Sequence, residues 1–190
     1  MKSVFISGIP TAGKSHLADK IAKVTGVMHF NIDDFREEMR NDPKFKQWID
    51  FFANQDEKKY WEEHSHEEHW ENLRRQSEGI WPFIKNKIND TLESGQVSIF
   101  EGVNLLPHLI SEVDIDGMYL LGESEETVLE RNRKDPRWGK AEELLKKQSE
   151  SFFQCERPMY KKEAEKYGFK TFIDLDMAEK ELLNLMGYKK

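Results

Sequence analysis

The sequence has few of the features that mark secreted, membrane-spanning or nucleic-acid-coating proteins. Cys155 is the single cysteine among 190 residues, so an intramolecular disulfide is excluded and a cytoplasmic location is expected. No run of about 18 apolar residues could form a membrane span, and the first residues leave no room for a signal peptide. Basic residues are in the minority, at 29 against 36 acidic ones, and the net charge of −7 argues against a nucleic-acid partner.

The remaining composition suits one globular α/β domain over residues 1–190. Hydrophobic residues make up 37% of the chain and aromatic residues 12%, which is enough for a single core and unlike a disordered chain. No internal repeat or low-complexity linker divides the sequence. The sequence leaves the oligomeric state open.

The most informative segment is a glycine-bounded loop at residues 8–15, which matches the phosphate-binding pattern G-x-x-x-x-G-K-[ST]. Such a loop exposes backbone N–H groups to phosphates beside the positive end of the next helix. Lys14 is expected to reach the β- and γ-phosphates, and Ser15 to place its hydroxyl on Mg²⁺. We therefore expect ATP and magnesium to bind here, with nucleotide contacts from Gly8, Ile9, Pro10, Thr11, Ala12, Gly13, Lys14 and Ser15.

Five short apolar segments alternate with helical patterns along the chain. Strands are predicted at residues 4–6, 28–32, 97–100, 115–121 and 169–173. This alternation predicts βαβ units, and therefore a parallel sheet with helices on both faces. The carboxyl ends of parallel strands share one edge of the sheet, where ligands bind in such folds.

Two prolines are expected to interrupt helical patterns. Residues 56–76 are predicted to form one or two helices, and Pro82 to open a new one. A long helix from residue 141 carries an apolar stripe that includes Phe152 and Cys155, and Pro158 should bend or interrupt it. Because Cys155 lies in this stripe, it is predicted to be chemically inert.

Acidic residues follow the second and third predicted strands, and so should meet the phosphate loop. Asp33 is expected to hold or deprotonate an acceptor hydroxyl, with Asp34 as the second candidate, and one of the two to cap the helix that starts at residue 35. Glu101 is expected to orient Mg²⁺ through water or to bind the acceptor. Gly102 would let the backbone approach the transferring phosphate, and Arg36 would meet an anionic acceptor or form a surface ion pair.

Three arginines cluster around a turn near residue 134. Guanidinium groups there could bridge donor and acceptor phosphates and stabilise transition-state charge. Arg131 and Arg133 lie two residues apart on a helix, so they point to different faces unless the helix ends between them. Arg131 is therefore the favoured catalytic arginine, with Arg133 and Arg137 as further nucleotide-binding candidates.

Histidines and tryptophans in residues 56–81 have less specific interpretations. His64, His66 and His69 are surrounded by glutamates in the pattern of a solvated helix face, which argues against structural zinc. The tryptophans in this segment are predicted to pack in the core or to line an acceptor pocket; they are Trp61, Trp70 and Trp81.

The chain resembles the small P-loop kinases of the nucleoside-monophosphate-kinase-like group. The resemblance is carried by Gly8–Ser15, Asn31-Ile32-Asp33-Asp34-Phe35-Arg36, Phe100-Glu101-Gly102, Arg131-Asn132-Arg133 and Gly168–Asp174. It implies a three-layer P-loop NTPase fold with a five-stranded parallel sheet of order 2-3-1-4-5. It also implies an acceptor-site insert at residues 36–94, between strands two and three, and an arginine-bearing lid at about 131–140.

Within this group, two short segments are similar to particular members. Residues 32–35 are similar to chloramphenicol phosphotransferase and polynucleotide kinases, and residues 100–107 to 2-phosphoglycerate kinase. The expected function is ATP- and Mg²⁺-dependent transfer of the γ-phosphate to a hydroxyl or phosphate group of a small metabolite. A nucleotide-binding switch without a small acceptor is the first alternative, and a polynucleotide 5′-kinase is the second, although an acidic insert fits a polynucleotide poorly.

Overall fold

A five-stranded parallel sheet forms the centre of the protein, seen here in a computed structural model that describes residues 1–189 and, of Ala53, the backbone alone. The strands lie in the order β2-β3-β1-β4-β5, as predicted. Their bounds are β1 Val4–Gly8, β2 Met28–Asn31, β3 Ser98–Glu101, β4 Asp116–Leu120 and β5 Lys170–Phe172. Every residue of β1 and β3 is buried, as expected for parallel strands that are covered on both faces.

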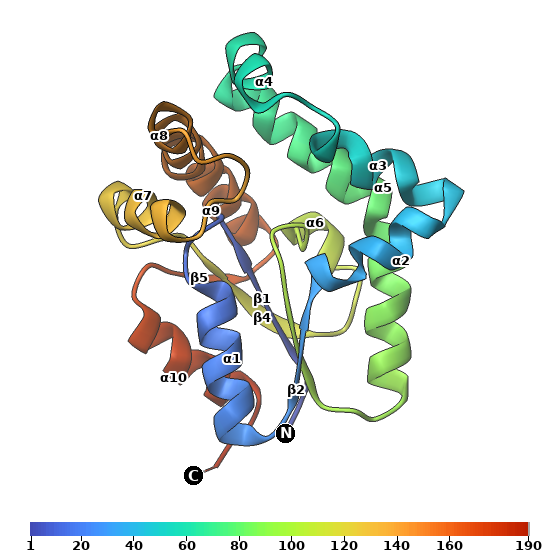
Figure 1. Cartoon of the computed structure of the whole chain (residues 1–190). Coiled ribbons are helices and arrows are strands. Elements are labelled where there is room, and N and C mark those ends of the chain that lie inside the picture. Colours follow the sequence, from blue (N-terminus) through green and yellow to red (C-terminus); the bar gives the residue numbers. More distant parts are fainter. Residues whose placement is uncertain (190) are drawn as a thin grey trace.

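Helices cover the two faces of this sheet and form three layers (Figure 1). On one face α1 (Lys14–Thr25) and α10 (Leu175–Leu185) pack together against the strands. On the other face α9 (Arg157–Lys166) packs against β4 and β5, and the short α6 (Pro107–Ile110) lies between α9 and α5 (His66–Glu93). No helix within residues 1–189 is long and apolar enough to cross a bilayer.

The segment between β2 and β3, the insert, is helical throughout most of its length. It contains the 3₁₀-helix η1 (Ile32–Phe35), then α2 (Arg36–Asn41), α3 (Pro43–Ala53), α4 (Glu57–Glu63) and α5. Asp42 caps α3 and Asp56 caps α4, each by accepting a hydrogen bond from a main-chain N–H of the first turn. In Figure 1 the upper part of the insert, with α4, faces α7 and α8 above the carboxyl edge of the sheet, and α5 runs back down beside the sheet.

The prediction that Pro82 opens a new helix is wrong, because α5 runs without interruption through Pro82 for 28 residues. Proline removes one main-chain hydrogen bond from a helix interior. Here Ile80, Trp81 and Ile84 are buried in the core on either side of it, so packing outweighs that loss. The true start of α5 has a complete capping box, formed by Ser65 and Glu68.

The helices after β4 form the other wall above the sheet. They are α7 (Glu125–Lys134), α8 (Glu142–Glu150), a π-helical segment η2 (Ser151–Glu156) and then α9. The predicted interruption before Pro158 is present, and Pro158 lies in the first turn of α9.

The π-helix changes which side chains point inward. The sequence pattern predicted that Cys155 would continue the buried stripe after Phe152. Instead Glu156 and Tyr160 are buried, because a π-turn holds one more residue than an α-turn and shifts the helix by one position. Cys155 is half-buried, and burial, followed by the nearby carboxylates of Glu67 and Glu156, raises the pKa of its thiol from 9.0 to about 11.

Candidate active site

The phosphate loop connects β1 to α1 at the carboxyl edge of the sheet. Gly8 has a φ of 118°, and a Cβ there would lie 2.0 Å from the carbonyl oxygen of Leu120 in β4. The first glycine of the motif is therefore required by the neighbouring strand as well as by the curl of the loop. Gly13, with a φ of 99°, gives the chain the left-handed conformation from which α1 begins.

Lys14 points back into the curve of its own loop. Its Nζ donates hydrogen bonds to the carbonyl oxygens of Gly8 and Ile9, at 3.1 and 2.8 Å, and the residue is 7% exposed. Burial lowers the pKa of Lys14 from 10.5 to about 8, an effect that Glu101 partly opposes and Arg137 reinforces. Glu156 and Asp33 also raise this pKa, so charged groups from four distant segments converge on the lysine.

The lowered pKa of Lys14 predicts a distinctive pH dependence of stability. The folded protein releases this proton near pH 8 and the unfolded chain near pH 10.5, so the unfolded state holds more protons between these values and the free energy of unfolding rises with pH. Between pH 8 and pH 10.5 the free energy of unfolding of the wild type should therefore rise by about 3 kcal/mol relative to that of Lys14→Met, at about 1.4 kcal/mol per pKa unit. Urea denaturation of both proteins at several pH values measures this difference. If the free energies of unfolding of the two proteins changed in parallel with pH, the lowered pKa of Lys14 would be contradicted.

Ser15, in the first turn of α1, and Glu101, at the end of β3, meet beside Lys14. The sequence predicted this meeting, because β1 and β3 end at the same edge of the sheet. The Ser15 hydroxyl donates to Oε1 of Glu101 at 2.9 Å, and Glu101 is 2% exposed. A hydroxyl and a carboxylate are the hard oxygen ligands that Mg²⁺ takes, and this ion commonly keeps a few protein ligands and fills its shell with water and phosphate oxygens. The pair therefore fits the predicted magnesium site. Within residues 1–189 no group of three or more His, Cys, Asp or Glu is arranged to hold a metal ion.

His29 is a neighbour of Glu101 that sequence reasoning missed. It lies on β2, and its Nε2 is 3.7 Å from Oε1 of Glu101, while its Nδ1 is 2.8 Å from Asp19. The carboxylate of Glu101, followed by that of Asp19, raises the pKa of His29 above its ordinary value. Only the strand order 2-3-1, which makes β2 the neighbour of β3, could have indicated this contact.

Asp33 and Arg36 form a pair at the start of the insert. Nε of Arg36 donates to Oδ1 of Asp33 at 2.9 Å. The expectation that one of the two aspartates caps the helix starting near residue 35 is wrong, because α2 has Phe35 at its N-cap and no side-chain cap hydrogen bond. The preceding η1 is capped by Asn31, whose side chain accepts the N–H of Asp33. Asp33 is therefore not used as a cap, and Asp34 is exposed.

Gly102 lies one residue beyond β3 and is fixed by packing. Its N–H donates to the carbonyl oxygen of Ile6, and a Cβ at Gly102 would lie 2.9 Å from the Cβ of Ile32. This contact with the insert gives a second reason for glycine, besides the predicted approach to phosphate.

The three arginines occupy different environments, in line with their helical spacing. Arg131 reaches the phosphate loop, where its Nη1 donates to the carbonyl oxygen of Thr11 at 3.2 Å. Arg133 is not brought to the loop and instead pairs with Glu142 at the surface. Arg137, in the turn after α7, lines a pocket beside the loop. Arg131 and Arg137 are thus the arginines that lie near the candidate nucleotide site.

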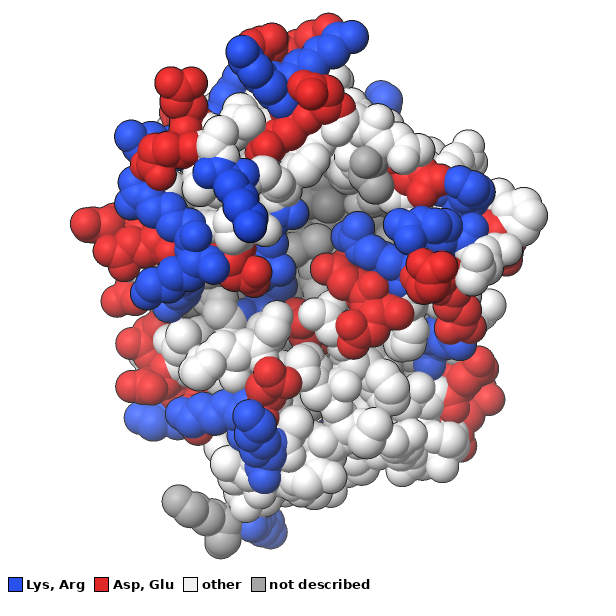
Figure 2. Space-filling view, in the orientation of Figure 1, with Lys and Arg blue, Asp and Glu red and all other residues white. Residues whose placement is uncertain are grey.

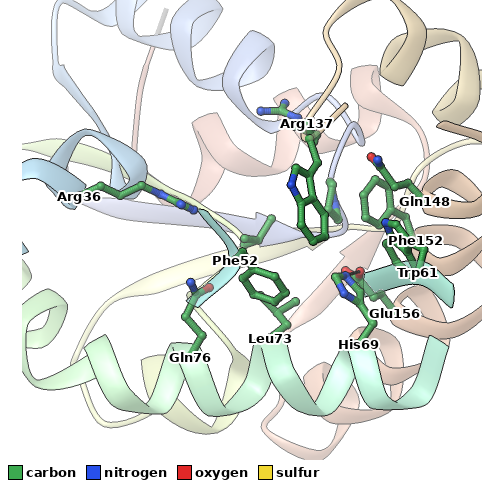
Figure 3. A pocket seen from close by; sticks show the side chains of 13 residues that line it. Arg36, Phe52, Trp61, His69, Leu73, Gln76, Arg137, Gln148, Phe152 and Glu156 are labelled. Atoms are coloured by element: carbon green, nitrogen blue, oxygen red, sulfur yellow. Dashed lines mark ion pairs between the residues drawn. The ribbon is translucent and has the colours of Figure 1, made fainter. Parts of the chain in front are cut away.

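A pocket of about 320 Å³ opens beside the phosphate loop, between the insert and the helices after β4. Its walls come from Pro10 of the loop, from α2, α3, α4 and α5, and from the segment after α7 (Figure 3). The lining residues are Pro10, Arg36, Phe52, Trp61, His69, Leu73, Gln76, Val103, Arg137, Trp138, Gln148, Phe152 and Glu156. In the space-filling view the surface is hollowed at this place, and basic side chains border the hollow (Figure 2).

The insert supplies a histidine and a tryptophan to this pocket. The glutamates around the three histidines are exposed as predicted, but His69 itself is buried and its Nδ1 lies 2.9 Å from the Tyr60 hydroxyl. Of the three tryptophans weighed for an acceptor pocket, Trp61 lines it. Trp70 packs against Tyr160, and Trp81 donates its N–H to Glu112, so both are structural.

Comparison with solved structures agrees with this geometry. A shikimate kinase from Acinetobacter baumannii, solved with shikimate, matches all of this chain and 95% of its own at 15% identity and a TM-score of 0.58. A deoxyadenosine kinase from M. mycoides, solved with dATP, matches 98% of this chain and all of its own at 17% identity and a TM-score of 0.51. The chain has the fold of the P-loop kinases.

Sequence comparison adds nothing more specific to this fold. No protein-family model matches the sequence, and no curated protein matches it. At identities this low a structural match establishes the fold alone. The narrower resemblance to chloramphenicol phosphotransferase and 2-phosphoglycerate kinase therefore stays a prediction.

Proposed function

We propose that the protein is an ATP- and Mg²⁺-dependent kinase that phosphorylates a hydroxyl group of a small molecule. One observation carries the proposal: the pocket beside the loop is lined both by Pro10 of the phosphate loop and by Arg36, the partner of Asp33. A molecule in this pocket would contact the donor loop at one end. The shikimate and deoxyadenosine kinases that share the fold, each named for a small substrate, support a small acceptor here.

The proposed reaction breaks the bond between the γ-phosphorus and its bridging oxygen and forms a new bond to the acceptor oxygen. Lys14 would leave the carbonyls of Gly8 and Ile9 and bind the β- and γ-phosphates, where its charge offsets that of the transferred group. Arg131, which donates to the carbonyl oxygen of Thr11, would bring a second positive charge to the phosphates. The acceptor proton would pass to the Asp33 carboxylate. Magnesium at Ser15 and Glu101 would neutralise phosphate charge.

The proposal predicts ADP release that depends on an added acceptor. The purified protein, ATP and MgCl₂ are incubated with a panel of sugars, polyols, hydroxy acids, nucleosides and amino alcohols, and ADP is followed by a coupled assay. At least one panel member should raise ADP release well above the rate without acceptor, and EDTA should abolish the increase. Nucleotide binding with no acceptor-dependent release would favour the nucleotide switch, and release with a 5′-hydroxyl oligonucleotide alone would favour the polynucleotide kinase.

A further inference from the structure

Glu156 is a buried carboxylate at the inner end of the pocket, beside His69. It is fully buried, and neither of its oxygens has a hydrogen-bond partner within residues 1–189. Nε2 of His69 lies 3.4 Å from Oε1, within ion-pair distance when the imidazole is protonated. A buried carboxylate whose oxygens accept no hydrogen bond is costly, so a ligand gains by donating hydrogen bonds to it.

Two other polar side chains of the wall are already engaged. Gln76 donates to the carbonyl oxygen of Trp48 and accepts from Asn104. Gln148 donates to Glu57 and accepts from Asn132. They shape the wall, but their hydrogen bonds are made inside the protein, so Glu156 remains the acceptor available to a ligand at this end.

Trp61 provides the complementary group. Its Nε1–H is buried, lies in a residue that lines the pocket, and has no acceptor within the described chain. The indole N–H can only donate. The rings of Trp61 and His69 have centroids 4.7 Å apart, and Figure 3 shows Trp61, His69 and Glu156 gathered on the same side of the pocket. One end of the pocket thus offers one acceptor group and one donor group.

The walls between this end and the phosphate loop are flat and apolar. Phe52, Trp61, Trp138 and Phe152 line the pocket, and the Trp138 ring lies 6.0 Å from that of Phe52. Aromatic rings stack well on planar ligands. At about 320 Å³ the pocket lies at the small end of the range for ligand sites, which limits it to a compact molecule.

We infer that the acceptor carries a planar nitrogen heterocycle with an N–H donor beside a hydrogen-bond acceptor, as the bases of nucleosides do. The N–H of the ring system donates to Glu156, its acceptor atom receives the Trp61 N–H, and its hydroxyl-bearing part extends toward Pro10 and Arg36. This inference rests on the proposed kinase function and names its substrate class. An alkylammonium group would leave the Trp61 N–H unpaired, and a carboxylic acid would be repelled by Glu156.

Binding measured without ATP tests the inference separately from catalysis. Isothermal titration calorimetry is run with adenosine, cytidine, uridine and guanosine. Choline, a cation, and benzyl alcohol, which has a flat ring, are the control ligands, because neither has an N–H donor beside a hydrogen-bond acceptor. At least one nucleoside should bind, and at least tenfold more tightly than choline or benzyl alcohol. The inference is overturned if none of the nucleosides binds at millimolar concentration, or if choline or benzyl alcohol binds as tightly.

Two variants assign the binding to the paired groups. Trp61→Phe keeps an aromatic ring and removes the N–H, and Glu156→Gln removes the charge; each should weaken nucleoside binding by about tenfold. Trp81→Phe is the matched control, because Trp81 donates its N–H to Glu112 away from the pocket and its loss should leave the affinity unchanged. Circular dichroism verifies folding, and unchanged affinity in folded Trp61→Phe would overturn the inference.

The two proposals can fail independently. Nucleoside binding without any ADP release in the acceptor panel would remove the kinase function and leave the heterocycle site in place. ADP release with sugars or polyols, without nucleoside binding, would remove the heterocycle site and leave the kinase function in place.

Discussion

Lys14→Met is expected to lower kcat by about 10³-fold while leaving the protein folded. The lysine is buried in the curve of the phosphate loop, where its ammonium group donates to two carbonyl oxygens. Removing one positioned donor from a transition state typically costs 10²- to 10³-fold in rate, and this donor also carries a full charge opposite the transferred phosphoryl group. The coupled ADP assay with the acceptor found in the panel measures the loss.

Stability should respond differently from activity in the same variant. A methionine of similar length fills the space without a buried charge, so the thermal midpoint at pH 7 should be equal to or higher than that of the wild type. Lys23→Met is the matched control, because Lys23 is an exposed lysine on the same helix. Full turnover in folded Lys14→Met would reject the phosphate-loop mechanism, whereas an unfolded variant would show that the lysine supports the loop itself.

Asp33→Asn is expected to reduce phosphotransfer by about 10²- to 10⁴-fold, the range for loss of a general base. Asparagine keeps the size of the side chain and an oxygen that can accept from Arg36, but it cannot take the acceptor proton. Nucleotide binding, measured by titration calorimetry with a non-hydrolysable ATP analogue and Mg²⁺, should remain, because the loop and Glu101 are unchanged.

Two further variants separate the role of Asp33 from a general effect of negative charge. Asp34→Asn should cost much less than Asp33→Asn, since both carboxylates are exposed but, within residues 1–189, only Asp33 pairs with Arg36 of the pocket wall. Glu37→Gln, which removes a mostly exposed carboxylate that pairs with Arg40, should be neutral. Equal losses at positions 33 and 34 would contradict the assignment of Asp33 as the base.

The fold and the donor site could be predicted because their signals are local in the sequence. A short apolar strand, a glycine loop and a helix stand in one stretch at residues 4–25, and the strand order followed from the resemblance that this stretch supports. The meeting of Ser15 with Glu101 needed only the rule that parallel strands end at one edge. These features depend on residue type and order, which a single sequence contains.

The pocket beside the phosphate loop could not be predicted because it depends on contacts between distant segments. Phe52, Trp61 and Glu156 come from α3, α4 and the π-helix, and no spacing in the sequence relates them. The capping of η1 by Asn31 was missed because Asn31, Asp33 and Asp34 are all suitable cap residues and stand within four positions. Continuation of α5 through Pro82 is likewise decided by tertiary packing, which outweighs the local preference of proline.

The π-helix has a consequence for how this pocket could change over evolutionary time. Glu156 follows Phe152 on the buried face because η2 holds an extra residue. Deleting one residue between Phe152 and Glu156 would restore the α-helical frame, in which position 155 takes that place, and the former Glu156 would then stand at position 155 with its carboxylate still on the buried face. The π-helix could therefore be lost by a one-codon deletion while the carboxylate, the sheet and the phosphate loop keep their places.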